Sequence, residues 1–133
     1  MINESKLKEI CDTYKIDYDK LVNNNENVLK NGEYYSICYV LDFLRDELNI
    51  EPRNIEKCPS ILYRNVENIK SNYEFLKDEQ ITKSSVEGCL HILLTEPTEL
   101  RRTYQYIIDN YGIRYLNART TILRVPVDRI KEI

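Results

Sequence analysis

The residues of this chain best suited to chemistry are arginines and tyrosines near its C-terminal end. The planar guanidinium of arginine can make two parallel hydrogen bonds to a phosphate or a carboxylate, and a tyrosine ring can stack on a nucleobase. The candidate binding residues are Arg101, Arg102, Arg114, Arg119, Arg124 and Arg129. Four tyrosines are interleaved with them, namely Tyr104, Tyr106, Tyr111 and Tyr115. The alternative interpretation is a solvated basic face, paired with acidic residues of the same or another molecule.

Residues typical of catalysis or metal binding are sparse. The single histidine is His91, and Cys89 lies two positions before it, about 200° away around an α-helix, so their side chains do not face each other. No CxxC, paired-histidine or HExxH spacing is present, and three glycines cannot form a phosphate-binding loop. Asp17-Tyr18-Asp19 begins like a calcium loop but lacks the required glycine and final glutamate. We therefore predict no catalytic residue, metal or cofactor, and a protein that is not an enzyme.

The composition is typical of one small globular domain. The chain has 133 residues, of which 42% are hydrophobic and 31% charged, and a core of its own is possible at this length. No apolar run approaches the ~20 residues that span a bilayer, and the polar start lacks the apolar centre of a secretion signal. We therefore expect a cytoplasmic protein, without a membrane partner, whose four cysteines are reduced and buried. The abundance of Ile, Asn and Lys beside one Ala favours an AT-rich bacterial genome or a mobile element.

The spacing of apolar residues predicts helices along nearly the whole chain. Apolar side chains recur every three or four residues, as they do on one face of an α-helix. Helices are expected over residues 4–15, 33–48, 65–79, 84–94, 97–111 and 115–123, with short helices at Pro52 and Pro126 and a short helix and loop within 17–31. No run alternates in polarity as a half-buried strand would. The predicted fold class is all-α.

A short sequence motif recurs at a fixed interval. The motif FLRDE at 43–47 returns as FLKDE at 75–79, 32 residues later, and a looser copy, IIDNY, follows after another 32 residues at 107–111. Each copy is followed by an isolated isoleucine (Ile50, Ile81 and Ile113) and then by an apolar cluster that ends at a proline (Pro59, Pro97 and Pro126). Such a unit cannot bury its apolar face alone, so copies stack on one another.

The repeat defines the expected domain organisation. We predict a single domain over residues 1–133, with an N-terminal helix and loop over 1–32. About three helix-turn-helix repeats are expected over 33–133, arranged as a short solenoid or as an irregular helical bundle.

Residues 53–81 resemble the repeat of the mitochondrial transcription termination factor (mTERF) family. In that repeat an apolar helix leads to a proline, an aliphatic pair follows, and a second helix ends in Phe-Leu or Leu-Leu before Gly-Ile or Gly-Leu. The matching residues are Pro59, Ile61, Leu62, Val66, Ile69, Phe75, Leu76 and Ile81. Gln80 replaces the glycine of the family, which is present as Gly112 before Ile113.

The resemblance covers about residues 40–130. A second match, from Pro97 to Ile113, is six residues shorter than the first, which predicts a helix shortened by about one and a half turns. Membership of this family implies a curved helical solenoid whose concave face binds nucleic acid.

Two binding roles stay open. The arginine-rich C-terminal residues favour contact with nucleic acid. The alternative is a protein–protein interaction or inhibitor module, from a bacterial mobile element, which the overall net charge of −3 favours. The charge is −5 over residues 1–52 and +4 over residues 100–133, a division that also permits head-to-tail self-association.

Overall fold

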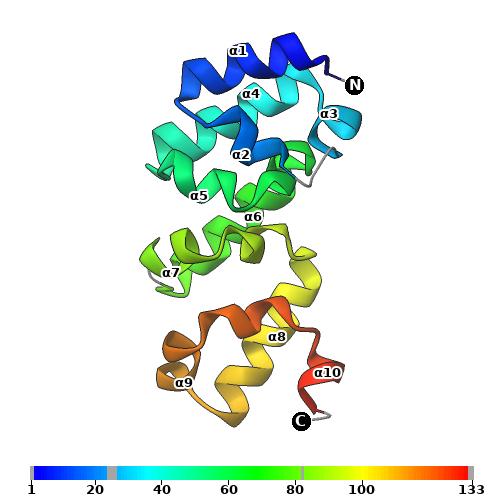
Figure 1. Cartoon of the computed structure of the whole chain (residues 1–133). Coiled ribbons are helices and arrows are strands. Elements are labelled where there is room, and N and C mark those ends of the chain that lie inside the picture. Colours follow the sequence, from blue (N-terminus) through cyan, green and yellow to red (C-terminus); the bar gives the residue numbers. More distant parts are fainter. Residues whose placement is uncertain (1, 24–26, 82, 132–133) are drawn as a thin grey trace. The chain divides into compact units, whose positions relative to one another are not determined.

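The computed structural model describes residues 2–23, 27–81 and 83–131 (Figure 1). The chain divides into two compact units, Met1–Val66 (unit 1) and Glu67–Ile133 (unit 2), which are described separately. The described ranges are helical and contain no strand, which confirms the all-α prediction. Within the same ranges, no helix combines the length and the apolar character needed to cross a membrane. The single-domain organisation stays a prediction.

Unit 1 is built from short helices (Figure 1), and their buried apolar side chains form its core. Its elements are α1 (Glu4–Tyr14), α2 (Tyr18–Val22), α3 (Asn27–Asn31), α4 (Tyr34–Asp42), the π-helical turn η1 (Phe43–Glu47), α5 (Pro52–Glu56) and the 3-10 helix η2 (Pro59–Tyr63). Asn3 caps α1, because its side chain accepts a hydrogen bond from the backbone N–H of Lys6 at 2.8 Å. The apolar stripes predicted for 4–15 and 33–48 supply buried core residues, including Leu7, Ile37 and Leu44.

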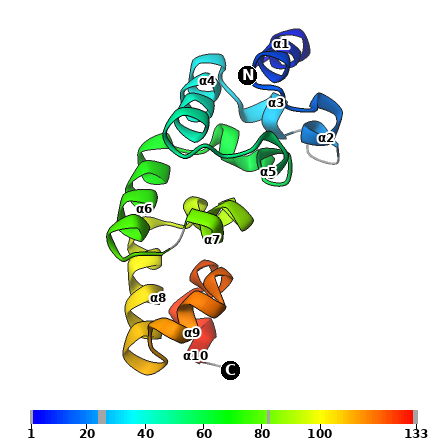
Figure 2. The same ribbon diagram turned by 90° about the vertical axis from the view of Figure 1, so that its left-hand side faces the viewer.

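Unit 2 alternates long and short helices. Its elements are α6 (Val66–Asp78), α7 (Lys83–Gly88), the 3-10 helix η3 (Leu90–Leu94), α8 (Pro97–Asn110), α9 (Ile113–Ala118), the 3-10 helix η4 (Thr120–Arg124) and α10 (Val127–Lys131). Figure 2 shows α6 and α8 along one side of this unit and the short helices α7 and α9 along the other. The helix predicted over 65–79 is confirmed as α6.

Two helices predicted to be continuous are each interrupted. The segments 84–94 and 115–123 both consist of a short α-helix followed by a 3-10 helix. The interruptions fall at Cys89 (φ −151°, ψ 83°) and Arg119 (φ −138°, ψ 50°), where the backbone is not helical. Val86 before the first interruption and Leu90 after it are both buried. The apolar pattern therefore continues through each break, which hides the break from the sequence.

The same order of elements occurs three times along the chain: a long helix, a tight turn, a short helix and a 3-10 helix. The 3-10 helices begin at Pro59, Leu90 and Thr120, which are 31 and 30 residues apart. Each contains an Ile-Leu pair at its third and fourth positions, namely Ile61-Leu62, Ile92-Leu93 and Ile122-Leu123. All of these side chains except Ile122 are buried. This local recurrence accords with a repeated unit, and the stacking of copies into a solenoid stays a prediction.

The turn after each long helix contains one residue with a positive φ. These residues are Asn49 (φ 52°), Gln80 (φ 64°) and Gly112 (φ 88°). In the first two turns the N–H of the next residue closes the turn: Ile50 donates to the carbonyl of Leu44, and Ile81 to that of Leu76, both at 2.9 Å. This geometry costs a residue with a Cβ about 1–2 kcal/mol and costs glycine little. It explains why glycine occupies one of the three positions.

Two details of the predicted repeat are wrong. Ile107, which accepts the turn hydrogen bond from Gly112 at 3.0 Å, is fully buried like Leu44 and Leu76. It therefore corresponds to the second residue of the Phe-Leu pairs and not to the first. The prolines are also not equivalent, because Pro59 begins η2, whereas Pro97 begins α8.

Proline is suited to the first turn of any helix, where its missing N–H has no intrahelical acceptor. It therefore marks different helix starts in different copies. The shorter match from Pro97 to Ile113 consequently does not indicate a shortened helix. α8 has 14 residues and α6 has 13.

Candidate functional site

Three tyrosine rings of unit 2 form a connected row. The centroids of Tyr111 and Tyr115 are 4.6 Å apart and their planes differ by 23°, which is a stacked arrangement. The ring of Tyr106 meets that of Tyr111 edge-on, with centroids 6.4 Å apart. Tyr111 is 51% exposed, and the other two rings are half-buried. We call Tyr106, Tyr111 and Tyr115 the tyrosine row.

A cation lies over the ring at each end of the tyrosine row. The guanidinium carbon of Arg119 is 4.5 Å from the ring centroid of Tyr115. The Nζ of Lys131 is 5.6 Å from the ring centroid of Tyr106. Such cation–π contacts contribute about 0.5–1 kcal/mol each at exposed sites. The row is therefore an aromatic surface with a positive charge at both ends.

The backbone of unit 2 determines where these side chains lie. Tyr106 belongs to α8, Tyr111 follows its last residue, and Tyr115 belongs to α9. The chain reverses between Tyr111 and Tyr115 at Gly112, whose positive φ lets the two rings meet. Arg119 is anchored by its backbone, since its N–H donates to the carbonyl of Leu116 and its carbonyl accepts from the N–H of Ile122, both at 3.0 Å.

The structure brings Arg119 to the tyrosine row and gives three other predicted arginines different contacts. All six predicted arginines are exposed. Arg101 lies over the ring of Phe75 at 4.9 Å and donates to the carbonyl of Pro97 at 3.4 Å. Arg102 donates to Glu99 Oε1 at 2.9 Å. Arg124 Nη1 is 3.9 Å from Cys89 Sγ.

The two remaining arginines lie on elements next to the row. Arg114 is on α9, beside Tyr115 in the sequence, and Arg129 is on α10, two residues before Lys131. Lys131 was not among the predicted site residues. Nothing in its sequence position signals a contact with Tyr106, 25 residues earlier. Only the net positive charge of this segment could have suggested it.

Tyr104 does not belong to the row, although it was one of the four tyrosines identified from the sequence as able to stack on bases. Its ring packs edge-on against Phe75 with centroids 5.2 Å apart, and its hydroxyl donates to Glu79 Oε2 at 2.8 Å. Burial, together with this hydrogen bond, raises the pKa of Tyr104 to about 12. The side chain therefore connects α8 to the end of α6. Glu79, which follows the last residue of α6, accepts this bond.

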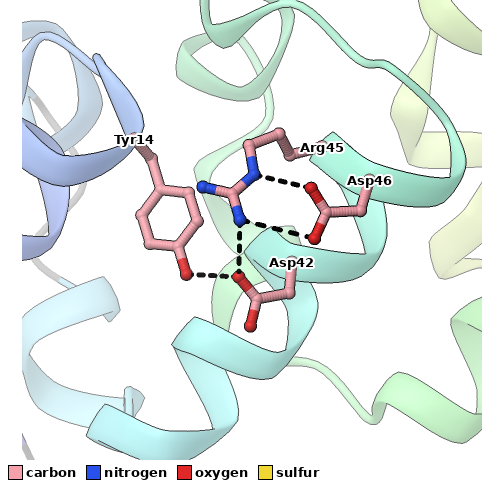
Figure 3. Close-up of polar contacts among 4 residues, drawn as sticks. All are labelled: Tyr14, Asp42, Arg45 and Asp46. Carbon is pink, nitrogen blue, oxygen red and sulfur yellow. Dashed lines mark hydrogen bonds and ion pairs between the residues drawn. The ribbon is translucent and has the colours of Figure 1, made fainter.

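Unit 1 contains a separate polar network around Tyr14 (Figure 3). The Tyr14 hydroxyl donates to Asp42 Oδ1 at 2.5 Å, and the Arg45 guanidinium lies 4.8 Å from the Tyr14 ring. Arg45 also donates to Asp46 Oδ1 at 2.8 Å, and this bond lowers the pKa of the Asp46 carboxyl. Burial and the bond to Asp42 raise the pKa of Tyr14 well above its ordinary value. Tyr14 therefore stays protonated and ties α1 to the end of α4.

The chemistry available elsewhere in the chain is limited. Among the described residues, no group of three or more His, Cys, Asp or Glu side chains could hold a metal ion. All four cysteines are free thiols; Cys11 and Cys58 are buried, whereas Cys38 and Cys89 are half-buried. Burial raises the pKa of Cys11 to about 11, which leaves that thiol unreactive at neutral pH.

No known protein resembles this chain closely enough to indicate its family or function. At a significant level, the chain matches no family model, no curated protein and no solved structure. The fold and the site together define an all-helical protein with an exposed surface of tyrosines and cations. The resemblance to mTERF repeats stays a prediction.

Proposed function

We propose that this chain is a non-enzymatic binding protein that holds single-stranded nucleic acid against the tyrosine row of unit 2. The observation that carries the proposal is a set of three contiguous tyrosine rings with Arg119 at one end and Lys131 at the other. Unpaired bases stack on such rings with about 1–3 kcal/mol per base and little sequence preference. Cations beside the rings can neutralise the phosphates that link those bases.

The chemistry of the row favours a single strand over a duplex. In a duplex each base face is covered by its neighbours, so only phosphates are available to the protein. A single strand offers both base faces and phosphates, and the row has partners for each. Two further exposed cations lie on the helices that carry Tyr115 and Lys131: Arg114 on α9 and Arg129 on α10. Neither is ion-paired within the described part of the chain.

The sequence supports the same class of ligand. The resemblance of residues 40–130 to mTERF repeats implies a helical solenoid that binds nucleic acid. The abundance of Ile, Asn and Lys favours a bacterium or a mobile element as the source, and we propose a cytoplasmic location. We include both in the proposal.

The test is binding of a fluorescently labelled oligothymidylate, measured by anisotropy at low salt. Substituting Tyr111→Ala or Arg119→Ala should weaken binding about tenfold each, as expected for one lost stack or one lost phosphate contact. Tyr111→Phe keeps a ring and should bind as the parent does. Arg102→Ala is the matched control, because Arg102 is exposed but already paired with Glu99.

The salt dependence gives a second measurement. Each phosphate contact to a single strand contributes about −0.7 to the slope of log K against log salt, so four contacting cations predict a slope of about −3. If the chain binds neither single-stranded DNA nor RNA at micromolar protein concentration, the proposal is refuted. Equal losses of affinity for Arg119→Ala and Arg102→Ala would show that the tyrosine row is not the binding site.

A protein-interaction or inhibitor module is the second candidate. The net charge of −5 over residues 1–52 favours it, because an acidic surface suits a basic protein partner. It predicts a partner that is recovered with the chain after nuclease treatment and is released by salt. Loss of every partner on nuclease treatment would instead support the nucleic-acid proposal.

A further inference from the structure

Two tyrosines of α4 in unit 1 are unusually exposed. Tyr35 is 85% exposed and Tyr39 is 51% exposed. They are four residues apart on a helix, so both project from the same face. The ring of Tyr35 also meets that of the exposed Tyr34 edge-on, with centroids 5.2 Å apart. Exposed aromatic side chains that cluster in this way are typical of binding surfaces.

These tyrosines line a cavity of about 400 Å³ together with Ser36, Arg64, Asn65 and Val66. The volume lies in the range of small-molecule sites, which is about 300–1,000 Å³. Arg64 is exposed and follows the end of η2, where the backbone is extended (φ −94°, ψ 165°). The cavity therefore combines two aromatic rings with one guanidinium.

The charge around this cavity differs from the charge of the unit that contains it. Residues 1–66 carry twelve Asp/Glu against nine Lys/Arg, yet no carboxylate lines the cavity and its one charged residue is Arg64. A ligand that fits must present a flat face to the tyrosines and a negative charge to Arg64. A nucleotide has both, in its base and its phosphate.

We infer that this cavity is a second base-stacking site, which takes an unpaired nucleobase between Tyr35 and Tyr39 and its phosphate at Arg64. The inference rests on the proposed function, because it assigns a further contact to the same class of ligand. One chain would then hold a strand at two independent places. A strand long enough to reach both sites should bind more tightly than a short one, since the second contact is made intramolecularly.

The chain offers a direct probe of each site because it contains no tryptophan. Tyr35→Trp places a single indole at the cavity, and Tyr111→Trp places one on the tyrosine row. Titration with oligothymidylate of about 20 nucleotides should quench the fluorescence of both. Tyr18→Trp, on α2 and outside both sites, is the control and should not be quenched. Circular dichroism of each variant checks that it folds as the parent does.

Further substitutions test the roles of the other two residues. In the Tyr35→Trp background, Tyr39→Ala should weaken the quenching titration about tenfold, as for one lost stacking partner. Arg64→Gln should weaken it and reduce its salt dependence, whereas Arg64→Lys keeps the charge and should largely restore it. The same substitutions are also made in the Tyr111→Trp background. There they should not change the quenching when the strand is too short to reach both sites.

The outcomes separate this inference from the proposed function. Quenching in Tyr111→Trp without quenching in Tyr35→Trp would overturn the inference and leave the row intact. Quenching in Tyr35→Trp alone would support the cavity and overturn the row. Quenching in neither would overturn both.

Discussion

The ring of Tyr111 lies nearly parallel to that of Tyr115, with 4.6 Å between their centroids, across a turn in which Gly112 has a φ of 88°. Tyr111 follows the last residue of α8, and Tyr115 is in the first turn of α9. The stack therefore exists only because the chain reverses at Gly112. One turn of the backbone both ends a helix and assembles the aromatic surface.

Substitution of Gly112 by alanine should lower the free energy of unfolding by about 1–3 kcal/mol, because its φ of 88° and ψ of 170° lie in a region that is essentially restricted to glycine. No atom lies within 4 Å of the Cβ that would be added, so the cost is conformational and not steric. Urea denaturation measures it, and oligonucleotide binding should weaken in the same variant. Gly88→Ala is the matched control: its Cβ also meets no atom within 4 Å, and it ends α7 without a positive φ. It should be neutral or slightly stabilising; equal losses for both variants would contradict the argument.

The corresponding turn after α6 makes the opposite prediction. Gln80 is exposed and has a φ of 64°, which an L-residue adopts only at a cost. Gln80→Gly should therefore raise the free energy of unfolding by up to ~1 kcal/mol. Gln80→Ala keeps the Cβ and should change little. Asn49→Gly should gain less than Gln80→Gly, since asparagine tolerates this geometry better. A loss of stability in Gln80→Gly would show that its side chain has a role in this turn.

The sequence predicts the helices well because burial repeats every three or four residues in both α- and 3-10 helices. This same property conceals the breaks at Cys89 and Arg119, where apolar residues continue on the buried side. The repeat was found through Phe43 and Phe75, but its third copy was placed one residue too late, with Ile107 aligned to the first residue of the Phe-Leu pairs and not to the second. The Ile-Leu pairs at 61, 92 and 122, all buried except Ile122, carry the same information with less ambiguity.

The sequence predicts which types of residue form the candidate site, but not which of them contact one another. Arginines and tyrosines near the C-terminal end were identified from residue type alone. Whether a ring faces the solvent or the core depends on tertiary packing: Tyr104 packs on Phe75, whereas Tyr111 stays half-exposed. The contact between Tyr106 and Lys131 joins two helices, and it depends on how α10 packs against α8, which neither residue specifies locally.

Asn72 provides a prediction about the core of unit 2. It is fully buried, and its Nδ2 donates to the carbonyls of Leu93 at 2.9 Å and Thr95 at 2.7 Å, at the end of η3. Asn72→Ala should cost about 1–3 kcal/mol, because the buried carbonyl of Leu93 and the half-buried carbonyl of Thr95 lose their donor. Asn72→Asp should cost more at neutral pH, since a carboxylate would face two carbonyl oxygens, and should recover in part in acid when it can donate a proton.

The next repeat has an equivalent hydrogen bond, and its removal can be compared with the loss of stability in Asn72→Ala. Thr103 on α8 donates from Oγ1 to the carbonyl of Val125 at 2.9 Å, at the end of η4. Thr103→Val removes this one bond while keeping the shape of the side chain, and should cost about 1 kcal/mol. Urea denaturation of the three variants gives the order. If Thr103→Val is more destabilising than Asn72→Ala, the hydrogen bonds of Asn72 are not what holds η3.

The phenol of Tyr104 should make unit 2 less stable at alkaline pH. Burial and the bond to Glu79 raise its pKa from the ordinary 10.0 to about 12. The folded protein therefore favours the neutral phenol, while the unfolded chain ionises from the ordinary value. The stability that this difference contributes is complete below pH 10.0 and is lost as the pH rises towards about 12.

Tyr104→Phe isolates this effect, because the ring can still pack on Phe75 but has no proton to lose and no bond to Glu79. The variant should be less stable than the parent at neutral pH, since Glu79 loses its donor. The difference should shrink as the pH rises through the window from 10.0 to about 12, where only the parent is weakened by ionisation of this phenol. Tyr14, whose pKa is also raised, is present in both proteins and cancels from the comparison. Urea denaturation at several pH values within the window measures the difference, and a gap that stays constant would mean that the hydroxyl of Tyr104 titrates normally and is not held by Glu79.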